Sequence, residues 1–236
     1  MERRKNKEKR EMTIAENLKR FKNELPENVT LVAVSKTKPV SDLMEAYNAG
    51  QRVFGENKIQ EMEAKWQEMP KDIQWHMIGH VQRNKVKYMA PFVSLIHAVD
   101  SFKLLNEINK EAEKNGRIIE CLLQIKIAEE DSKFGMHEAD AAKLLASEEI
   151  KTLQNVKVVG LMGMATFTDD TKQISEEFQK LKKIYTEFRI QPFNSAQGDN
   201  FRILSMGMSG DYKIAIENGS NLVRVGSAIF GERNYQ

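Results

Sequence analysis

The sequence predicts an α/β fold, a single-domain (β/α)8 barrel of the TIM type preceded by an N-terminal helix. Three observations predict it: eight short, almost continuously apolar segments, amphipathic helical segments between them, and a length of 236 residues. Strands buried on both faces have this composition in parallel sheets. Strict alternation of strands and helices implies right-handed crossovers, and eight such units fill one barrel domain.

The elements follow one another in a regular order. A Thr13–Glu16 capping box begins the first helix and Pro26 ends it. Ser41 is expected to cap the second helix. Apolar residues at helical spacing place the helices at 41–50, 59–66, 84–88, 102–116, 139–145, 174–185 and 214–219. The expected strands are 31–35, 53–55, 75–78, 95–99, a part of 118–127, 156–162, 201–204 and 222–225.

A doubly wound open sheet is the competing fold. It normally carries a glycine-rich dinucleotide-binding turn after its first strand, and residues 35–39, SKTKP, do not form one. No linker divides the chain. We therefore expect a basic flexible lead-in at residues 1–11, either a solvated stretch or a weak anion-binding arm, and one barrel domain over 12–236.

Composition narrows the function. Lys and Arg number 36 and Asp and Glu 34, and the net charge of +2 argues against a nucleic-acid partner. The single cysteine, Cys121, excludes a disulfide within the chain and is typical of a reducing cytoplasm. No apolar run approaches the ~20 residues that span a bilayer. The basic start precedes no apolar segment of the kind found in secretory signals. We expect a cytoplasmic protein without a membrane partner.

Two loops at the predicted barrel mouth suggest a phosphate site. In such barrels the chemistry lies at the carboxyl ends of the strands, and the loops after strands seven and eight often bind phosphate. Here these loops are residues 205–210, SMGMSG, and 225–227, VGS. Glycine lets backbone amides approach an anion, serine supplies hydroxyl donors, and a following helix start adds a favourable dipole. The alternative is ordinary turn glycines with Ser209 as a helix cap.

Lys36 ends the first predicted strand. Alternation along the strand puts Val32, Val34 and Lys36 on one face. A buried lysine has a lowered pKa and a nucleophilic amine, which condenses with aldehydes to a Schiff base. The alternative is a lysine that extends its ammonium group to solvent at the strand end. The residues alone leave both open.

Metal binding is not expected. His76 and His80 are four residues apart, which on a strand is about 13 Å, too far to share one ion. No compact cluster of His, Asp and Glu ligands stands out. His76 is expected to be a buried histidine with its hydrogen bonds satisfied.

Several motifs resemble the pyridoxal-phosphate homeostasis protein family (the YggS/PROSC group). They occur in order over residues 12–233. They are 33–39 (AVSKTKP), 54–57 (FGEN), 75–85 (WHMIGHVQRNK), 160–162 (GLM), 204–209 (LSMGMS) and 223–226 (VRVG). The resemblance implies a barrel like the N-terminal domain of alanine racemase that binds pyridoxal 5′-phosphate (PLP).

The resemblance also implies residue roles. Lys36 is the Schiff-base lysine and the one residue with a catalytic role. Asn57 lies near the ring of the cofactor, and Arg224 faces its pyridine nitrogen. The phosphate is held by hydroxyl groups and backbone amides of Ser205, Met206, Gly207, Gly226 and Ser227.

The family is regarded as a carrier of PLP in intracellular vitamin B6 homeostasis, without an established turnover. Arginine only donates hydrogen bonds and stays protonated, so a ring nitrogen facing Arg224 stays unprotonated and the ring is a poor electron sink. Racemases with this barrel carry a second domain, which we expect to be absent because the chain ends soon after Ser227. We expect a monomer that delivers PLP to PLP-dependent apo-enzymes.

The alternative is a Schiff-base enzyme, aldolase-like or racemase-like, acting on a small phosphorylated or amino-acid substrate. The sequence departs from the family pattern at Lys58, where an aromatic residue is usual, and at Lys126. Lys38, Lys58 or Lys126 could act as a second acceptor of the cofactor.

Overall fold

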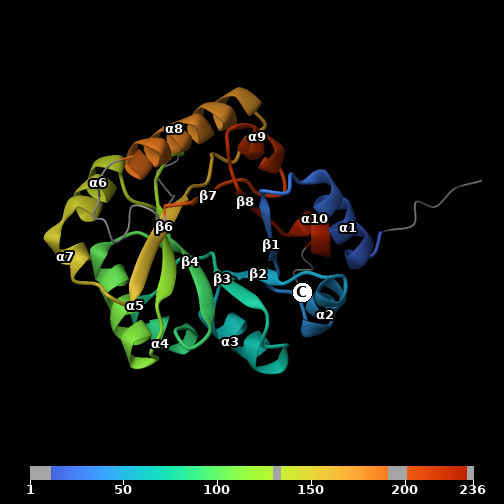
Figure 1. The fold of residues 1–236 in the computed structure, drawn as a ribbon. Helices are drawn as coiled ribbons and strands as arrows, with labels where there is room; N and C mark the ends of the chain where they lie inside the picture. The colour runs from blue at the N-terminus through green and yellow to red at the C-terminus, as the bar shows by residue number, and fades with distance from the viewer. Residues whose placement is uncertain (1–11, 130–133, 191–200, 233–236) are drawn as a thin grey trace, which may run out of the picture.

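The computed structural model describes residues 12–129, 134–190 and 201–232, and these form a closed barrel of eight parallel strands (Figure 1). Neighbours in sequence are neighbours in the sheet, and pairing of the first strand with the eighth closes the barrel. The strands are β1 (Thr30–Val34), β2 (Val53–Glu56), β3 (Gln74–Met77), β4 (Val93–Val99), β5 (Ile119–Gln124), β6 (Val156–Met162), β7 (Ile203–Ser205) and β8 (Leu222–Val225). The predicted fold class is confirmed. The basic lead-in, residues 1–11, lies outside the described residues.

Helices surround the barrel on its outside (Figure 1). In the described ranges they are α1 (Ile14–Glu24), α2 (Val40–Asn48), α3 (Ile59–Glu68), α4 (Val86–Met89), α5 (Phe102–Lys114), α6 (Glu138–Ala146), α7 (Glu148–Lys151), α8 (Thr171–Ile190), α9 (Tyr212–Glu217) and α10 (Ser227–Phe230), with a 3₁₀ turn, η1 (Arg83–Lys85). None of the helices described combines the length and apolar composition needed to cross a bilayer.

Two helix starts test the capping predictions. The Thr13–Glu16 capping box is confirmed: the Thr13 hydroxyl accepts from the Glu16 amide at 3.2 Å, and the Thr13 amide donates to the Glu16 carboxylate at 2.8 Å. The cap predicted at Ser41 is wrong, because α2 begins at Val40 with Pro39 at its N-cap. The carbonyl of Pro39 accepts from the Asp42 amide at 3.1 Å, which places Ser41 inside the first turn.

The lower part of the barrel interior is apolar. Val32, Leu95, Leu122, Val159 and Leu222 form one buried cluster there, separate from the larger core between strands and helices. Each points inward because alternate residues of a strand face the same side. This cluster is the floor on which the polar residues of the barrel rest.

Above this apolar cluster, toward the carboxyl ends of the strands, the barrel interior becomes polar at His97 of β4, Ser205 of β7 and Arg224 of β8. The Arg224 guanidinium donates to the Ser205 hydroxyl at 2.5 Å. Ser205 Oγ lies 3.1 Å from His97 Nδ1, and His97 Nε2 lies 3.1 Å from Nδ1 of His76 on β3. Because Arg224 can only donate, the arrangement that also uses the Ser205 hydrogen runs from Ser205 to His97 and from His97 to His76. His76 is thus a buried histidine with a hydrogen-bond partner, as predicted.

Burial keeps both imidazoles neutral. It lowers the pKa of His76 from 6.5 to about 3. It also holds the pKa of His97 well below the usual histidine value, and the neighbouring His76 and the positive charge of Arg224 lower it further. The hydrogen bonds from Ser205 to His97 and on to His76 therefore link neutral rings, and Arg224 is the one positively charged member of this series.

These pKa shifts predict that the protein loses stability in mild acid. The unfolded chain takes up protons on its histidines below pH 6.5, whereas the folded His76 takes one up only near pH 3. Stability therefore falls as the pH drops through this window. We expect a loss of about 2 kcal/mol from His76 alone between pH 7 and 5, measured by urea unfolding.

The His76→Gln variant is the control, because its amide oxygen can still accept from His97. Its unfolding free energy is expected to change less between pH 7 and 5 than that of the wild type, by about 2 kcal/mol. An unchanged pH dependence would show that His76 is protonated in the folded protein.

Candidate functional site

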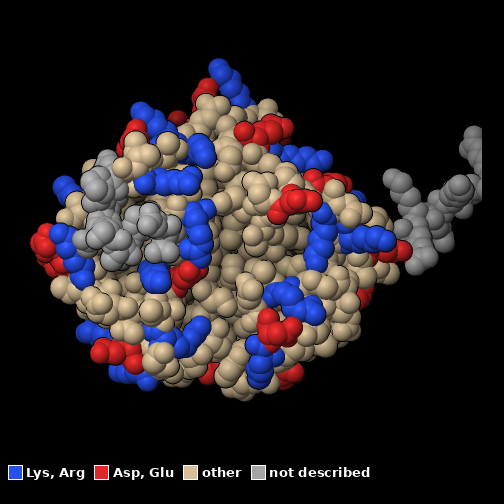
Figure 2. Space-filling view, in the orientation of Figure 1, with Lys and Arg blue, Asp and Glu red and all other residues tan. Residues whose placement is uncertain are grey.

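A cavity of about 610 Å³ opens at the carboxyl ends of the strands. Its walls come from the loops after β1, β2, β6, β7 and β8 together with side chains of the strand ends. On the face drawn in Figure 2, charged side chains of both signs are interspersed around a largely uncharged centre. The residues that carry chemistry must therefore be sought inside the cavity.

Lys36 lies in the cavity wall. Val32 belongs to the apolar floor of the barrel, while Val34 and the half-buried Lys36 line the cavity above it. The predicted alternation of these three residues on one face is confirmed. The position brings an amine to the mouth of the barrel next to apolar and polar walls.

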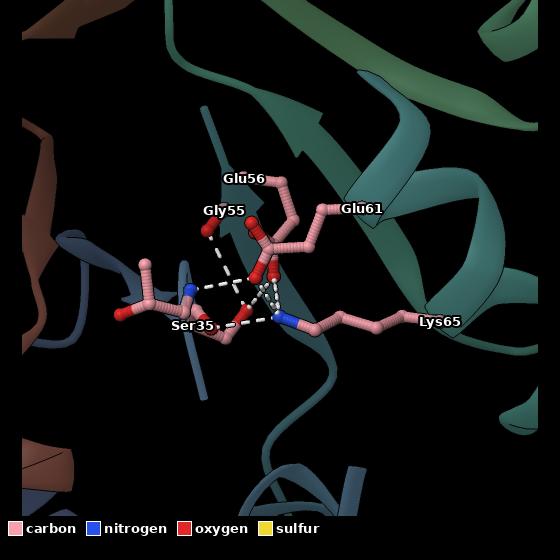
Figure 3. A network of polar contacts seen from close by, with 6 residues as sticks. Ser35, Gly55, Glu56, Glu61 and Lys65 are labelled. Carbon is pink, nitrogen blue, oxygen red and sulfur yellow. Dashed lines mark hydrogen bonds and ion pairs between the residues drawn. The ribbon is translucent and has the colours of Figure 1, made fainter. Parts of the chain in front are cut away.

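The residues on both sides of Lys36 are held by a buried polar network (Figure 3). The Lys65 ammonium, from α3, donates to the Ser35 carbonyl at 2.8 Å, to Glu56 Oε1 at 2.8 Å and to Glu61 Oε1 at 2.7 Å. The Ser35 hydroxyl donates to the same Glu56 oxygen at 2.6 Å. The Thr37 amide donates to Glu61 Oε1 at 2.6 Å. One network therefore holds the backbone before and after Lys36.

Thr37 and Glu56 are the unusual members of this network. Thr37 has φ of 66°, the one positive φ outside glycine among the described residues, and a β-branched side chain makes that conformation unfavourable. Glu56 is fully buried, and its Oε2 makes no hydrogen bond within the described residues. Burial raises the pKa of Glu56, while Lys65 and Ser35 oppose the shift. Both features are unfavourable by themselves, and the network around Lys65 compensates for them.

Asn57 lines the cavity directly after β2. Gly79, in the loop after β3, allows the Asn57 backbone to approach this loop closely. A Cβ atom on Gly79 would lie 2.5 Å from the Asn57 carbonyl oxygen and 2.8 Å from its Cα. The loops after β2 and β3 can therefore touch only because residue 79 has no side chain.

Arg224 reaches the cavity from inside β8. It is buried, donates to the Ser205 hydroxyl and to the Gly163 carbonyl at 3.0 Å, and forms part of the cavity wall. Burial lowers the pKa of Arg224 to about 10, so the group is still cationic at neutral pH. Two of its five N–H donors are thus engaged by the protein, at a point where the others can serve a ligand.

The structure places the predicted phosphate residues differently. Gly226 and Ser227 line the cavity, but the lining that the described residues form does not include Ser205, Met206 or Gly207. Ser205 and Met206 are fully buried beneath the cavity. The carbonyl of Gly207 accepts from the Arg224 amide at 3.0 Å. These three residues support the site from below.

The part of the loop that lines the cavity is 208–211, which includes Ser209 and Gly210. The Gly226 amide donates to the Ser209 hydroxyl at 3.2 Å, which joins the loops after β7 and β8. The predicted strand ended at residue 204, whereas the Gly163 amide bonds to the Ser205 carbonyl at 3.1 Å and extends the ladder by one residue. Ser209 is not the cap of α9, whose N-cap is Asp211.

One wall was missed by sequence reasoning. Thr166–Asp169, after β6, lines the cavity, with Phe167 94% exposed at its rim. Glu177 of α8 holds this loop: its carboxylate accepts from the Thr166 amide at 2.6 Å and from the Thr166 hydroxyl at 2.7 Å. A glutamate on the buried face of an amphipathic helix, next to Phe178, was the available signal.

The other lysines of interest are less well placed. Lys38 lines the cavity, but its ammonium group donates to the carbonyls of Phe230 and Glu232 at 2.8 and 2.9 Å. Lys58 is exposed and Lys126 half-buried, and neither belongs to the cavity lining traced from the described residues. Within those same residues no cluster of three or more His, Cys, Asp or Glu side chains could hold a metal ion.

Known proteins resemble this chain in sequence and fold. Residues 11–234 match the family model for the alanine racemase N-terminal domain. The pyridoxal phosphate homeostasis protein of Aquifex aeolicus is 38% identical over 206 residues, 87% of each chain. That of Vibrio alginolyticus is 40% identical over 215 residues, 89% of each chain.

A solved structure agrees with these relatives. PipY of Synechococcus elongatus PCC7942, solved with PLP bound, superposes with a TM-score of 0.80 and 34% identity, covering 93% of this chain and 100% of that one. Sequence and fold thus lead to the same group of proteins, and the chain belongs to the pyridoxal phosphate homeostasis protein family.

Proposed function

We propose that the cavity binds pyridoxal 5′-phosphate, with Lys36 as the lysine that anchors it. The observation that carries the proposal is that an amine, a buried guanidinium and a serine–glycine pair of loops line one cavity of about 610 Å³. PLP needs these three kinds of partner, for its aldehyde, its ring nitrogen and its phosphate. The structure of the relative PipY with PLP bound supports PLP as the ligand.

The residues present fit each end of this cofactor. Ser209, Gly210, Gly226 and Ser227 offer hydroxyl groups and closely approachable backbone to a phosphate. Gly226 has little room for a side chain, since a Cβ atom there would lie 3.1 Å from the Val34 carbonyl oxygen. At the other end, PLP supplies an aldehyde that condenses with the Lys36 amine to a Schiff base with loss of one water molecule.

Arg224 determines what the bound ring can do. Its guanidinium is held by Ser205 and Gly163 and carries a positive charge at neutral pH. A ring nitrogen that accepts from it stays unprotonated, and such a ring stabilises a carbanion weakly. We therefore infer that the protein binds and releases PLP in intracellular vitamin B6 homeostasis, as a monomer that supplies PLP-dependent apo-enzymes, without robust turnover.

Reduction with borohydride tests the anchoring lysine. The purified protein is expected to be yellow, and after reduction the pyridoxyl group should map to Lys36. The Lys36→Ala variant is expected to lose the visible absorbance, whereas Lys126→Ala keeps it. A protein that stays colourless and unmodified after incubation with PLP would refute the proposal.

Ser209→Ala tests the phosphate end. The variant loses a hydroxyl that lines the cavity and accepts from the Gly226 amide. We expect the affinity for PLP to fall by about tenfold, as for one lost hydrogen bond to a charged group. Pyridoxal, which has no phosphate, is the matched ligand and should bind the wild type and the variant alike. An equal fall for both ligands would place the phosphate elsewhere.

Racemisation of alanine tests the inferred lack of turnover. Because Arg224 leaves the ring nitrogen unprotonated, the PLP-loaded protein is expected to convert L-alanine to D-alanine only at a trace rate, followed with a D-amino acid oxidase assay. Rapid conversion by the wild type that is abolished in Lys36→Ala would favour the enzyme alternative.

A further inference from the structure

We propose that Lys65, which lines no part of the cavity traced from the described residues, is a positioning residue for Lys36. The buried Lys65 ammonium holds the backbone before Lys36 directly, through the Ser35 carbonyl, and the backbone after it through Glu61, which accepts from the Thr37 amide. It thereby sets the direction from which the Lys36 amine meets an aldehyde; Figure 3 shows the network around Lys65. This inference rests on the proposed function, because it assumes that Lys36 forms the Schiff base.

The donors of Lys65 match its acceptors in number. An ammonium group has three N–H donors, and Lys65 Nζ has three acceptors at 2.7 to 2.8 Å: the Ser35 carbonyl, Glu56 Oε1 and Glu61 Oε1. The Lys65 side chain is only 7% exposed. A neutral side chain cannot supply three donors there, and the planar fork of arginine has a different geometry. The network is therefore specific for lysine at this position.

The backbone next to Lys36 is strained. Thr37 adopts a φ of 66°, which a threonine avoids in the absence of other constraints. Its amide is held by Glu61 Oε1, the same oxygen that accepts from Lys65. Lys65 neutralises and orients this carboxylate from one helical turn away on α3. Without Lys65, the bond that stabilises the Thr37 conformation loses its support.

The end of β1 is held independently of Lys65. Two backbone bonds hold Ser35 without Lys65: the Ser35 amide donates to the Gly55 carbonyl at 3.0 Å, and the Lys38 amide donates to the Ser35 carbonyl at 3.1 Å. Loss of Lys65 therefore leaves the end of β1 in place and loosens the short turn that carries Lys36. A purely structural cluster would instead affect the whole cavity, including the proposed phosphate loops after β7 and β8, of which the loop after β8 lies next to β1.

The test compares two ligands on the Lys65→Met variant. Pyridoxine 5′-phosphate keeps the ring and the phosphate of PLP but has no aldehyde, so it binds without reacting with Lys36. We expect its dissociation constant to change by less than about twofold in Lys65→Met, while the equilibrium constant for Schiff-base formation with PLP, from the visible absorbance, falls by about tenfold or more. Lys71→Met is the control, because Lys71 bonds to the Trp66 and Gln67 carbonyls in the last turn of α3, which are not acceptors of the Lys65 network.

A parallel fall for both ligands, or no change for either, would overturn the proposal. Thermal unfolding of the ligand-free variants shows whether they are folded. If Lys65→Met does not fold, Glu61→Gln decides, because its amide oxygen can still accept from Thr37 while the charge opposite Lys65 is gone. The same selective loss for PLP, by about threefold, is then expected, and equal effects on the two ligands refute the proposal. A wild type that binds neither ligand refutes the proposed function itself.

Discussion

The buried Arg224 guanidinium is the constraint around which the barrel mouth is arranged. Its two side-chain bonds join β8 to Ser205 of β7 and to Gly163 at the end of β6, and Ser205 continues to His97 and His76 on β4 and β3. Five strands are thus tied into one polar layer. A charge in this position is unfavourable unless its donors find acceptors, so the layer persists only with its partners intact.

The two buried cations of the described residues, Lys65 and Arg224, are held in different ways. Lys65 faces two carboxylates, Glu56 and Glu61, so its charge is compensated within the network. Arg224 bonds to a hydroxyl and a carbonyl, and the charge of Asp211, which also lines the cavity, raises the Arg224 pKa against the effect of burial. The positive charge of Arg224 therefore lies at the cavity. An electron-rich ring nitrogen or an anion would be stabilised there, whereas Lys65 has no such effect on a ligand.

The sequence patterns predicted those features of the structure that follow from the regular periodicity of strands and helices. Alternation along β1 predicted that Lys36 faces the interior, and the eight apolar segments predicted the barrel. Within the predicted phosphate loop, 205–210, the patterns could not show that Ser205 is buried beneath the cavity while Ser209 lines it, because one additional ladder bond decides where the strand ends. Contacts between distant residues were also out of reach. Lys65 bonds to a carbonyl 30 residues away, and nothing in the local spacing of α3 distinguishes it from a surface lysine.

The network around Lys65 is difficult to explain by stability alone. Buried ion pairs are often no more stable than well-packed apolar residues of the same volume. This one leaves Glu56 Oε2 without a hydrogen bond in the described residues and accompanies an unfavourable φ at Thr37. Both unfavourable features are adjacent to residues of the proposed site: Thr37 follows Lys36, and Glu56 precedes Asn57. An apolar replacement would remove the polar bonds that give the Lys36 turn one defined conformation. The unfavourable features are therefore best understood as the consequence of fixing the proposed anchoring lysine in a loop, where the regular bonds of a strand have ended.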